Sequence, residues 1–199
     1  MRGQRSFVRG AVCALLLGLA PLSPALSQEQ SPLETEALAL DPGHYVWRPE
    51  LASSGSVEIV VSLPLQTAYV FRGGTLIGVS TVSTGAPGYD TPTGTFQILQ
   101  KKVDHRSNLY DDAPMPFMQR LTWDGVALHA GKIPGYAASH GCVRLPMAFA
   151  RKLYQATSLG ASVHVVDAMP ASASEALALG RNPDAWQSEL DAELARGTR

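Results

Sequence analysis

A cysteine and two histidines lie close together in residues 128–145, which read LHAGKIPGYAASHGCVRL. His129 precedes Cys142 by thirteen residues, and His140 lies two residues before the cysteine. A cysteine thiol is a weak nucleophile until a neighbouring base removes its proton or a cation lowers its pKa. The glycines and prolines between the two residues let the chain fold back, so His129 can reach Cys142 as a base. The spacing therefore predicts a thiol nucleophile with an imidazole base.

The neighbours of Cys142 indicate the remaining parts of such a site. Gly141 would let backbone N–H groups approach a developing oxyanion, so the amides of Gly141 and Cys142 are candidate donors. Arg144 lies two residues on, and its planar guanidinium can hold a substrate carboxylate through two parallel hydrogen bonds. A turn through Ser139 and His140 would present the thiol to its base.

Residues 1–27 have the features of a cleaved export signal. Three arginines precede an apolar run over residues 11–20, and Ala25-Leu26-Ser27 places small residues at the −3 and −1 positions. The run is shorter than the roughly 20 apolar residues that span a bilayer. We therefore expect cleavage after Ser27, a periplasmic location and no transmembrane segment in the mature chain. A retained N-terminal anchor is the alternative.

The mature chain would contain one cysteine, because Cys13 leaves with the signal. Exported proteins usually pair their cysteines, since their compartment is oxidising. A single remaining Cys142 therefore indicates a working thiol or an intermolecular disulfide.

Length and composition allow one globular domain with tails. The chain has 199 residues, of which 45% are hydrophobic, enough for a substantial core. Residues 28–199 carry 13 basic and 17 acidic residues, so they lack the positive balance of nucleic-acid-binding domains. We expect no nucleic-acid partner.

Runs rich in valine and isoleucine, with glycine-rich turns between them, predict a mainly β scaffold. A hairpin turning at Asp124-Gly125 would deliver His129 to a strand end. Apolar spacing after Pro146 predicts a helix that stops near Gly160. His164 is expected to be a satisfied or solvent-facing strand residue. Strands are expected at residues 56–63, 67–72, 75–83, 95–99 and 162–166.

The motif from Ser139 to Leu145, SHGCVRL, with His129-Ala130-Gly131 before it, resembles the active-site signature of the L,D-transpeptidases, the YkuD-like family. Val82-Ser83-Thr84-Gly85 and the stretch Thr91-Pro92-Thr93-Gly94-Thr95-Phe96 resemble the strand, turn and strand before that site. The resemblance implies a mainly β, β-sandwich-like catalytic domain with one or two short helices.

The resemblance extends over about residues 55–167 and so divides the chain. Residues 28–54 would be an N-terminal linker or extension with a short helical turn at 33–40. Residues 168–199 would be an Ala/Glu-rich, helical tail. Its last helix would begin at Asn182 and carry an apolar stripe of Trp186, Leu190 and Leu194.

The resemblance also implies a reaction on the tetrapeptide stems of peptidoglycan. Cys142 would attack the L-centre carbonyl of the diamino acid, release terminal D-alanine and form a thioester. An amine would resolve the thioester as a cross-link, as D-amino acid exchange or as attachment of a wall-anchored lipoprotein. No cofactor and no metal are implied, and carbapenems would acylate Cys142.

The same resemblance assigns roles to the motif residues. His129 would be the general base, oriented by a carbonyl at Ala130 or Gly131. Ser139, Gly141 and Arg144 would contact the substrate or the oxyanion, with His140 and Gly131 in support. Residues 101–120, including Tyr110, Met115 and Met118, would form a lid over the cleft, consistent with a long irregular loop.

Other functions remain open from the sequence. Within the family, the enzyme would be an L,D-carboxypeptidase or an amidase that releases wall-bound lipoprotein. Outside it, His129, His140 and Cys142 would be zinc ligands, although their spacing matches no zinc-finger pattern. A non-catalytic wall-binding module is the last alternative.

Overall fold

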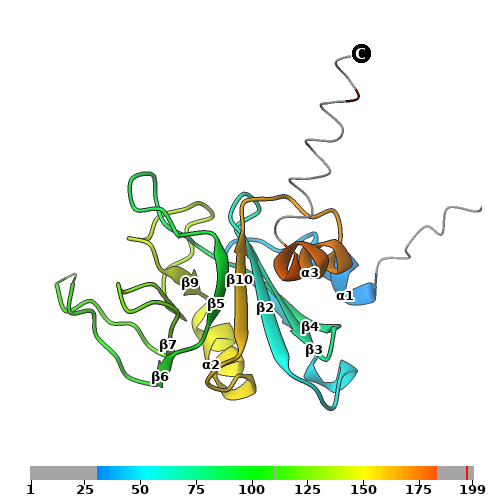
Figure 1. Cartoon of the computed structure of the whole chain (residues 1–199), viewed down its shortest axis with the longest axis horizontal. Coiled ribbons are helices and arrows are strands. Elements are labelled where there is room, and N and C mark those ends of the chain that lie inside the picture. The colour runs from blue at the N-terminus through cyan, green and yellow to red at the C-terminus, as the bar shows by residue number, and fades with distance from the viewer. Residues whose placement is uncertain (1–30, 110, 183–195, 197–199) are drawn as a thin grey trace, which may run out of the picture.

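The computed structural model describes residues 31–109, 111–182 and 196, which form two β-sheets and a few short helices (Figure 1). The larger sheet has the order β1 (Tyr45–Trp47), β4 (Thr75–Thr81), β3 (Thr67–Arg72), β2 (Val57–Ser62), β10 (Ser162–Val166), β5 (Gly94–Gln97). The smaller sheet has the order β6 (Gln100–Lys102), β7 (Met118–Arg120), β8 (Ala127–Ala130), β9 (Val143–Leu145). The helices are α1 (Pro32–Ala37), the 3-10 turn η1 (Pro49–Leu51), α2 (Met147–Ala156) and α3 (Ala173–Arg181). The predicted mainly β, two-sheet fold class is confirmed.

Strand β2 is apolar on both faces because both faces are covered. Ile59 and Val61 lie in the main core with Leu128 and Val143 of the smaller sheet. Val60 points the other way and packs under α3. A strand covered on both sides needs a nearly continuous apolar run. Figure 1 shows the large sheet between the small sheet and the helices α1 and α3.

Residues 31–54, expected as a linker or extension, fold onto the large sheet. Helix α1 begins with a capping box, in which the Ser31 hydroxyl accepts from the Glu34 amide and the Glu34 carboxylate accepts from the Ser31 amide at 2.8 Å. Strand β1 pairs antiparallel with β4. Leu33 is buried against Val46 and Val79. The stretch is therefore part of the folded body, and the predicted helical turn is α1.

The turn between β3 and β4 is made by two glycines. Gly73 and Gly74 have φ values of 57° and 83°, in the left-handed region that favours glycine. The two strands then pair antiparallel over their full length, with one irregularity between Val70 and Phe71.

Helix α2 is shorter than the sequence predicted. Pro146 is its N-cap rather than its first residue. The helix ends at Ala156, because Thr157 is extended and its hydroxyl donates to Gln119 Oε1 at 2.6 Å. The Lys101 ammonium donates to the carbonyls of Tyr154 and Thr157, each at 2.6 Å. A cation that binds these C-terminal carbonyls stabilises the end of the helix before Gly160.

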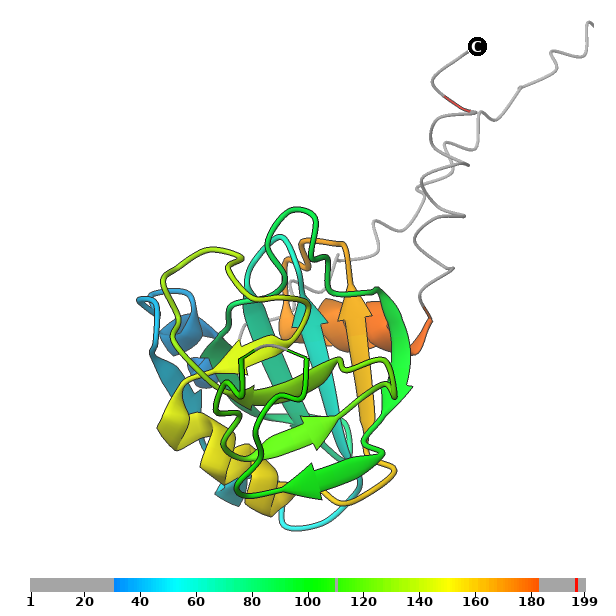
Figure 2. The ribbon, with the colours of Figure 1, turned by 90° about the vertical axis from the view of Figure 1, so that its left-hand side faces the viewer.

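The segment 101–120, predicted as irregular, contains strand at both ends. Lys101 of β6 and Gln119 of β7 are paired in an antiparallel ladder. Pattern reasoning missed these strands because both carry polar residues whose partners lie in the last turn of α2 and at Thr157 just after it. The loop between β6 and β7 lies over the small sheet, which Figure 2 shows in front of the large one.

Helix α3 lies in the first part of residues 168–199, the predicted tail. Ser172 caps it by accepting from the Glu175 amide at 3.1 Å. The predicted helix from Asn182 with Trp186, Leu190 and Leu194, and the predicted signal in residues 1–27, lie outside the described residues. No helix in the described part of the chain is long and apolar enough to cross a membrane.

His164 of β10 is more enclosed than a solvent-facing strand residue. Its side chain is buried, and Nδ1 lies 3.0 Å from Thr95 Oγ1. Nε2 lies 4.0 Å from the Glu58 carboxylate, which pairs with Arg181 of α3 at 2.6 Å. The residue therefore belongs to a polar cluster between the large sheet and α3.

Candidate active site

Strand register brings the predicted residues to one face of the small sheet. Strands β8 and β9 are parallel, with His129 opposite Arg144. Leu128 and Val143 point into the core, so alternate residues point outward. Cys142 immediately precedes β9 and lies two residues before Arg144, so it shares the outward face. His129 and Cys142 are thirteen residues apart in the sequence, but they lie diagonally across from each other on the neighbouring strands β8 and β9.

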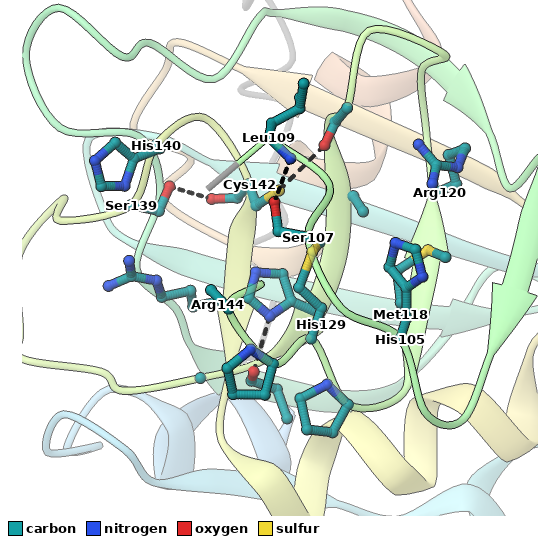
Figure 3. A pocket seen from close by; sticks show the side chains of 18 of the residues that line it. His105, Ser107, Leu109, Met118, Arg120, His129, Ser139, His140, Cys142 and Arg144 are labelled. Carbon is teal, nitrogen blue, oxygen red and sulfur yellow. Dashed lines mark hydrogen bonds between the residues drawn. The ribbon is translucent and has the colours of Figure 1, made fainter. Parts of the chain in front are cut away.

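A cavity of about 480 Å³ opens on this face (Figure 3). No described residue that lines it is Asp or Glu. Gly141 does not line it. The predicted site residues that do line it are Gly131, His129, Ser139, His140, Cys142 and Arg144.

The imidazole of His129 is held in one tautomer. Its Nδ1 lies 2.8 Å from the Ala130 carbonyl oxygen, which can only accept, so Nδ1 carries the proton and Nε2 is left as the base. The side chain is 8% exposed. Burial lowers the pKa of His129, the Ala130 carbonyl opposes this shift, and the charges of Arg144 and His105 lower it further. The ring is therefore neutral at neutral pH.

Burial in this site favours the protonated form of the Cys142 thiol. Burial raises its pKa, and the Ala127 backbone and the charges of Arg144 and Arg120 partly oppose the shift. Sγ donates to the Gly125 carbonyl at 3.4 Å. These two shifts favour a neutral thiol and a neutral imidazole in one cavity, so a nucleophilic attack by Sγ would require transfer of the thiol proton to a base.

The Gly141 amide, predicted as one of two oxyanion donors, already has a hydrogen-bond acceptor in this structure. It donates to Ser139 Oγ at 3.1 Å, and the same hydroxyl donates to the Cys142 carbonyl at 2.5 Å. Ser139 lines the cavity but is 2% exposed, and both hydrogen bonds of its hydroxyl are made within the loop that carries the thiol. The Cys142 amide is left as the candidate oxyanion donor.

Sequence reasoning assigned no role to Thr91. Its hydroxyl fixes the loop before Cys142 through two hydrogen bonds. Its hydroxyl donates to the Gly141 carbonyl at 2.9 Å and accepts from the Gly85 amide at 2.8 Å. Thr91 is 4% exposed. Gly141 has φ 103°, which explains the need for glycine there. The signal in the sequence was the Thr-Pro-Thr-Gly stretch, whose first residue is Thr91.

His140 lies at the rim of the cavity. Its ring packs edge-on against Tyr89, with ring centroids 4.5 Å apart. Its predicted supporting role stays a prediction.

Gly131 makes room for the side chain of Arg144. A Cβ at Gly131 would lie 3.0 Å from both Cγ and Cδ of Arg144, closer than ordinary carbon contacts. Within the described chain, the Arg144 guanidinium has no carboxylate partner. The arginine predicted to bind substrate thus lies in the cavity with its charge unpaired.

The loop between β6 and β7 lines the other side of the cavity. Met115 is buried and packs with Met118, Ala127 and Cys142. Met118 belongs to β7 rather than to the predicted lid. Tyr110 lies outside the described residues. Pattern reasoning also missed His105 and Arg120, which line the same side.

The zinc alternative requires His129, His140 and Cys142 to converge. Among the described residues, no group of three or more His, Cys, Asp or Glu side chains is placed to hold a metal ion.

Comparison with known proteins agrees with the motif. A family model of the L,D-transpeptidase catalytic domain, YkuD, matches residues 56–165. No curated protein matches the chain at a significant level.

Solved structures give the same likeness. An L,D-transpeptidase from Mycobacterium smegmatis is 26% identical with a TM-score of 0.53, over 56% of this chain and 58% of that chain. One from Stackebrandtia nassauensis is 30% identical with a TM-score of 0.53, over 61% and 60%. An L,D-transpeptidase in complex with imipenem is 25% identical with a TM-score of 0.52, over 56% and 59%. The chain therefore spans less than two thirds of the length of each. Because the family model covers more than half of this chain, the protein belongs to the L,D-transpeptidase catalytic domain family.

Proposed function

We propose that the protein is an exported peptidoglycan L,D-transpeptidase with Cys142 as nucleophile and His129 as general base. One observation carries the proposal: a neutral imidazole, with Nδ1 held by the Ala130 carbonyl at 2.8 Å, shares one cavity and one sheet face with the thiol. This arrangement leaves Nε2 able to accept the thiol proton. The signal-like pattern of residues 1–27 supports export to the periplasm.

Acylation would begin with transfer of the Cys142 proton to His129 Nε2. Sγ attacks the carbonyl carbon at the L-centre of the stem's diamino acid, and the Cys142 amide donates to the resulting oxyanion. When the tetrahedral intermediate collapses, the C–N bond to D-alanine breaks. The imidazolium of His129 protonates the departing amine, and a thioester remains.

Deacylation would run the same proton transfers with an amine acceptor. His129 takes a proton from the amine as it attacks the thioester carbonyl. The C–S bond breaks, an amide forms and the Cys142 thiol regains its proton. A second stem would give a cross-link, a D-amino acid would give exchange and a lipoprotein lysine would give attachment. With water as acceptor, the enzyme is a carboxypeptidase.

Mass spectrometry of a disaccharide-tetrapeptide incubated with purified protein tests the proposal. We expect loss of terminal D-alanine with dimer formation, and an exchanged product when glycine or a D-amino acid is added. Cys142→Ser should abolish both products, and His129→Gln should slow them by about 10²- to 10⁴-fold. Tripeptide alone would make the enzyme a carboxypeptidase. No change in the presence of reductant would contradict the proposal and favour the amidase or binding-module readings.

Imipenem gives a readout that needs no acceptor. Because a related L,D-transpeptidase was solved in complex with imipenem, we expect the protein to gain the mass of one drug molecule. Peptide mapping should place it on Cys142, with no gain in Cys142→Ser. An unmodified wild-type chain would count against an activated thiol.

A further inference from the structure

Two arginines lie on either side of the thiol on the outward face of the small sheet. Strand β7 places Arg120 opposite Ala127 of β8, and β9 places Arg144 opposite His129 of β8. Paired residues point to the same face, and neighbouring strands lie about 4.8 Å apart. The backbones of β7 and β9 are therefore about 10 Å apart, with the strand that carries the base between them. Figure 3 shows Arg120 and Arg144 on opposite sides of Cys142 and His129.

Arg120 lies level with the Cys142 thiol across the strands of the small sheet. The register places it opposite Ala127, against which the half-buried Cys142 packs. Alanine carries only a methyl group, so little side chain stands between the guanidinium and Sγ. The charge of Arg120 reaches the thiol, because it is one of the cations that lower the pKa of Cys142.

The Arg120 guanidinium is held in place, and among the described residues only its Nε has a hydrogen-bond acceptor. Nε donates to Gln100 Oε1 at 3.1 Å, and the guanidinium carbon lies 5.7 Å from the centroid of the Trp123 ring. No described carboxylate pairs with Arg120, and no described Asp or Glu lines the cavity. A half-buried cation with free N–H groups is suited to binding an anion, and guanidinium matches carboxylate in particular.

We propose that Arg120 binds a carboxylate on the side chain of the acyl-donating residue, while Arg144 binds the C-terminal carboxylate of the leaving residue. The assignment follows from which residues lie opposite one another on β7, β8 and β9, and it rests on the proposed function. His129 protonates the leaving amine, so the arginine opposite His129 lies on the leaving side. Arg120 lies level with Cys142 across the strands. It is therefore on the side where the residue that becomes the thioester would lie. The preferred donor is thus a peptide with a free carboxylate on each of its last two residues.

Two donor peptides test the proposal. They share one sequence, and the side-chain carboxylate of the acyl-donating residue is free in one and amidated in the other. Wild type should favour the free carboxylate. Arg120→Gln should lower kcat/KM on that donor by about 10- to 100-fold, mainly through KM, and should change the amidated donor little. Arg120→Lys should fall between, because it keeps the charge and loses the paired hydrogen bonds.

Lys102→Gln is the matched control. Lys102 is exposed, does not line the cavity and lies close enough for its charge to lower the pKa of His105. The Lys102→Gln substitution removes one positive charge near the site. An unchanged donor preference in this variant would show that loss of net charge does not cause the effect of Arg120→Gln. Should Arg120→Gln fail to fold by circular dichroism, Arg120→Lys carries the same comparison.

Equal losses on both donors would overturn the inference and leave the proposed function standing, because an effect through the thiol or the fold acts on both alike. If wild type released no D-alanine from either donor, the proposed function would fail. Calorimetric binding of the two donors to Cys142→Ser, with and without Arg120→Gln, would then decide the inference separately. An Arg120-dependent preference for the free carboxylate supports it, and equal affinities overturn it.

Discussion

Replacing Thr91 with valine should weaken both the fold and the reaction. Valine has nearly the shape of threonine but lacks the hydroxyl. The change removes the donor to the Gly141 carbonyl at 2.9 Å and the acceptor of the Gly85 amide at 2.8 Å. Thr91 is buried, so water does not readily replace either bond.

The loss of stability can be worked from these two bonds. A buried polar group left without its partner costs about 1–3 kcal/mol. Two such groups give roughly 2–4 kcal/mol, since the glycine loops can relax in part. For a chain of this size, that lowers Tm by about 4–16 °C.

The loss of activity follows from the geometry of one peptide unit. The Gly141 carbonyl and the Cys142 amide belong to the same planar trans peptide and point in opposite directions. By holding the carbonyl, Thr91 sets the direction of the amide that we propose as the oxyanion donor. Losing such a donor costs about 10²- to 10³-fold in kcat, so loosening it should cost roughly 10- to 100-fold with little change in KM.

The assay is D-alanine release from the tetrapeptide, at a temperature where circular dichroism shows Thr91→Val to be folded. Thr91→Ser keeps the hydroxyl and should retain most of the stability and kcat. The reasoning would be refuted if Thr91→Val kept the wild-type kcat, or if the serine and valine variants lost the same amount. Either result would mean that the hydroxyl does not orient the loop.

Three further predictions follow from the site and from the buried histidines. Burial holds the pKa of His129 below its ordinary value of 6.5, so kcat/KM should fall in acid with a midpoint below pH 6.5, and a profile flat from about pH 4 to 8 would remove His129 as base. Gly131→Ala should push the Arg144 side chain, which would lie 3.0 Å from the added Cβ, and raise KM by about 10-fold without unfolding, whereas an unchanged KM would mean that Arg144 does not hold the donor. Burial also lowers the pKa of His164, opposed by the charge of Glu58. The unfolded chain therefore binds a proton at His164 below about pH 6.5 that the folded chain excludes, and stability falls as the pH falls through that range. Urea unfolding at pH 7.5 and pH 5 should show a smaller loss for His164→Gln than for wild type, and equal losses would contradict this.

Much of the fold and the candidate site could be predicted because the signals are local. The apolar run of β2, the Gly73-Gly74 turn and the strand before His129 each depend on a few neighbouring residues. The pairing of a single thiol, Cys142, with His129 thirteen residues earlier can also be recognised from one short segment of sequence. These are patterns of side-chain type and spacing, and they do not require knowledge of distant contacts.

The parts that failed depend on contacts between distant segments. Helix α2 ends early because Lys101 and Gln119, on two other strands, meet its last turn. The loop before the thiol is held by Thr91, fifty residues earlier, whose hydroxyl donates to the Gly141 carbonyl.

The sequence by itself determined the chemical groups of the candidate site and the periodicity of the sheets that carry them. Only the tertiary structure decided which donors stay free, which tautomer His129 adopts and that Arg120 lies beside the thiol. The physical reason is register. Which side chains share a face, and which backbone groups are already paired, depends on how β7, β8 and β9 align, and a shift of one residue would turn each side chain to the opposite face.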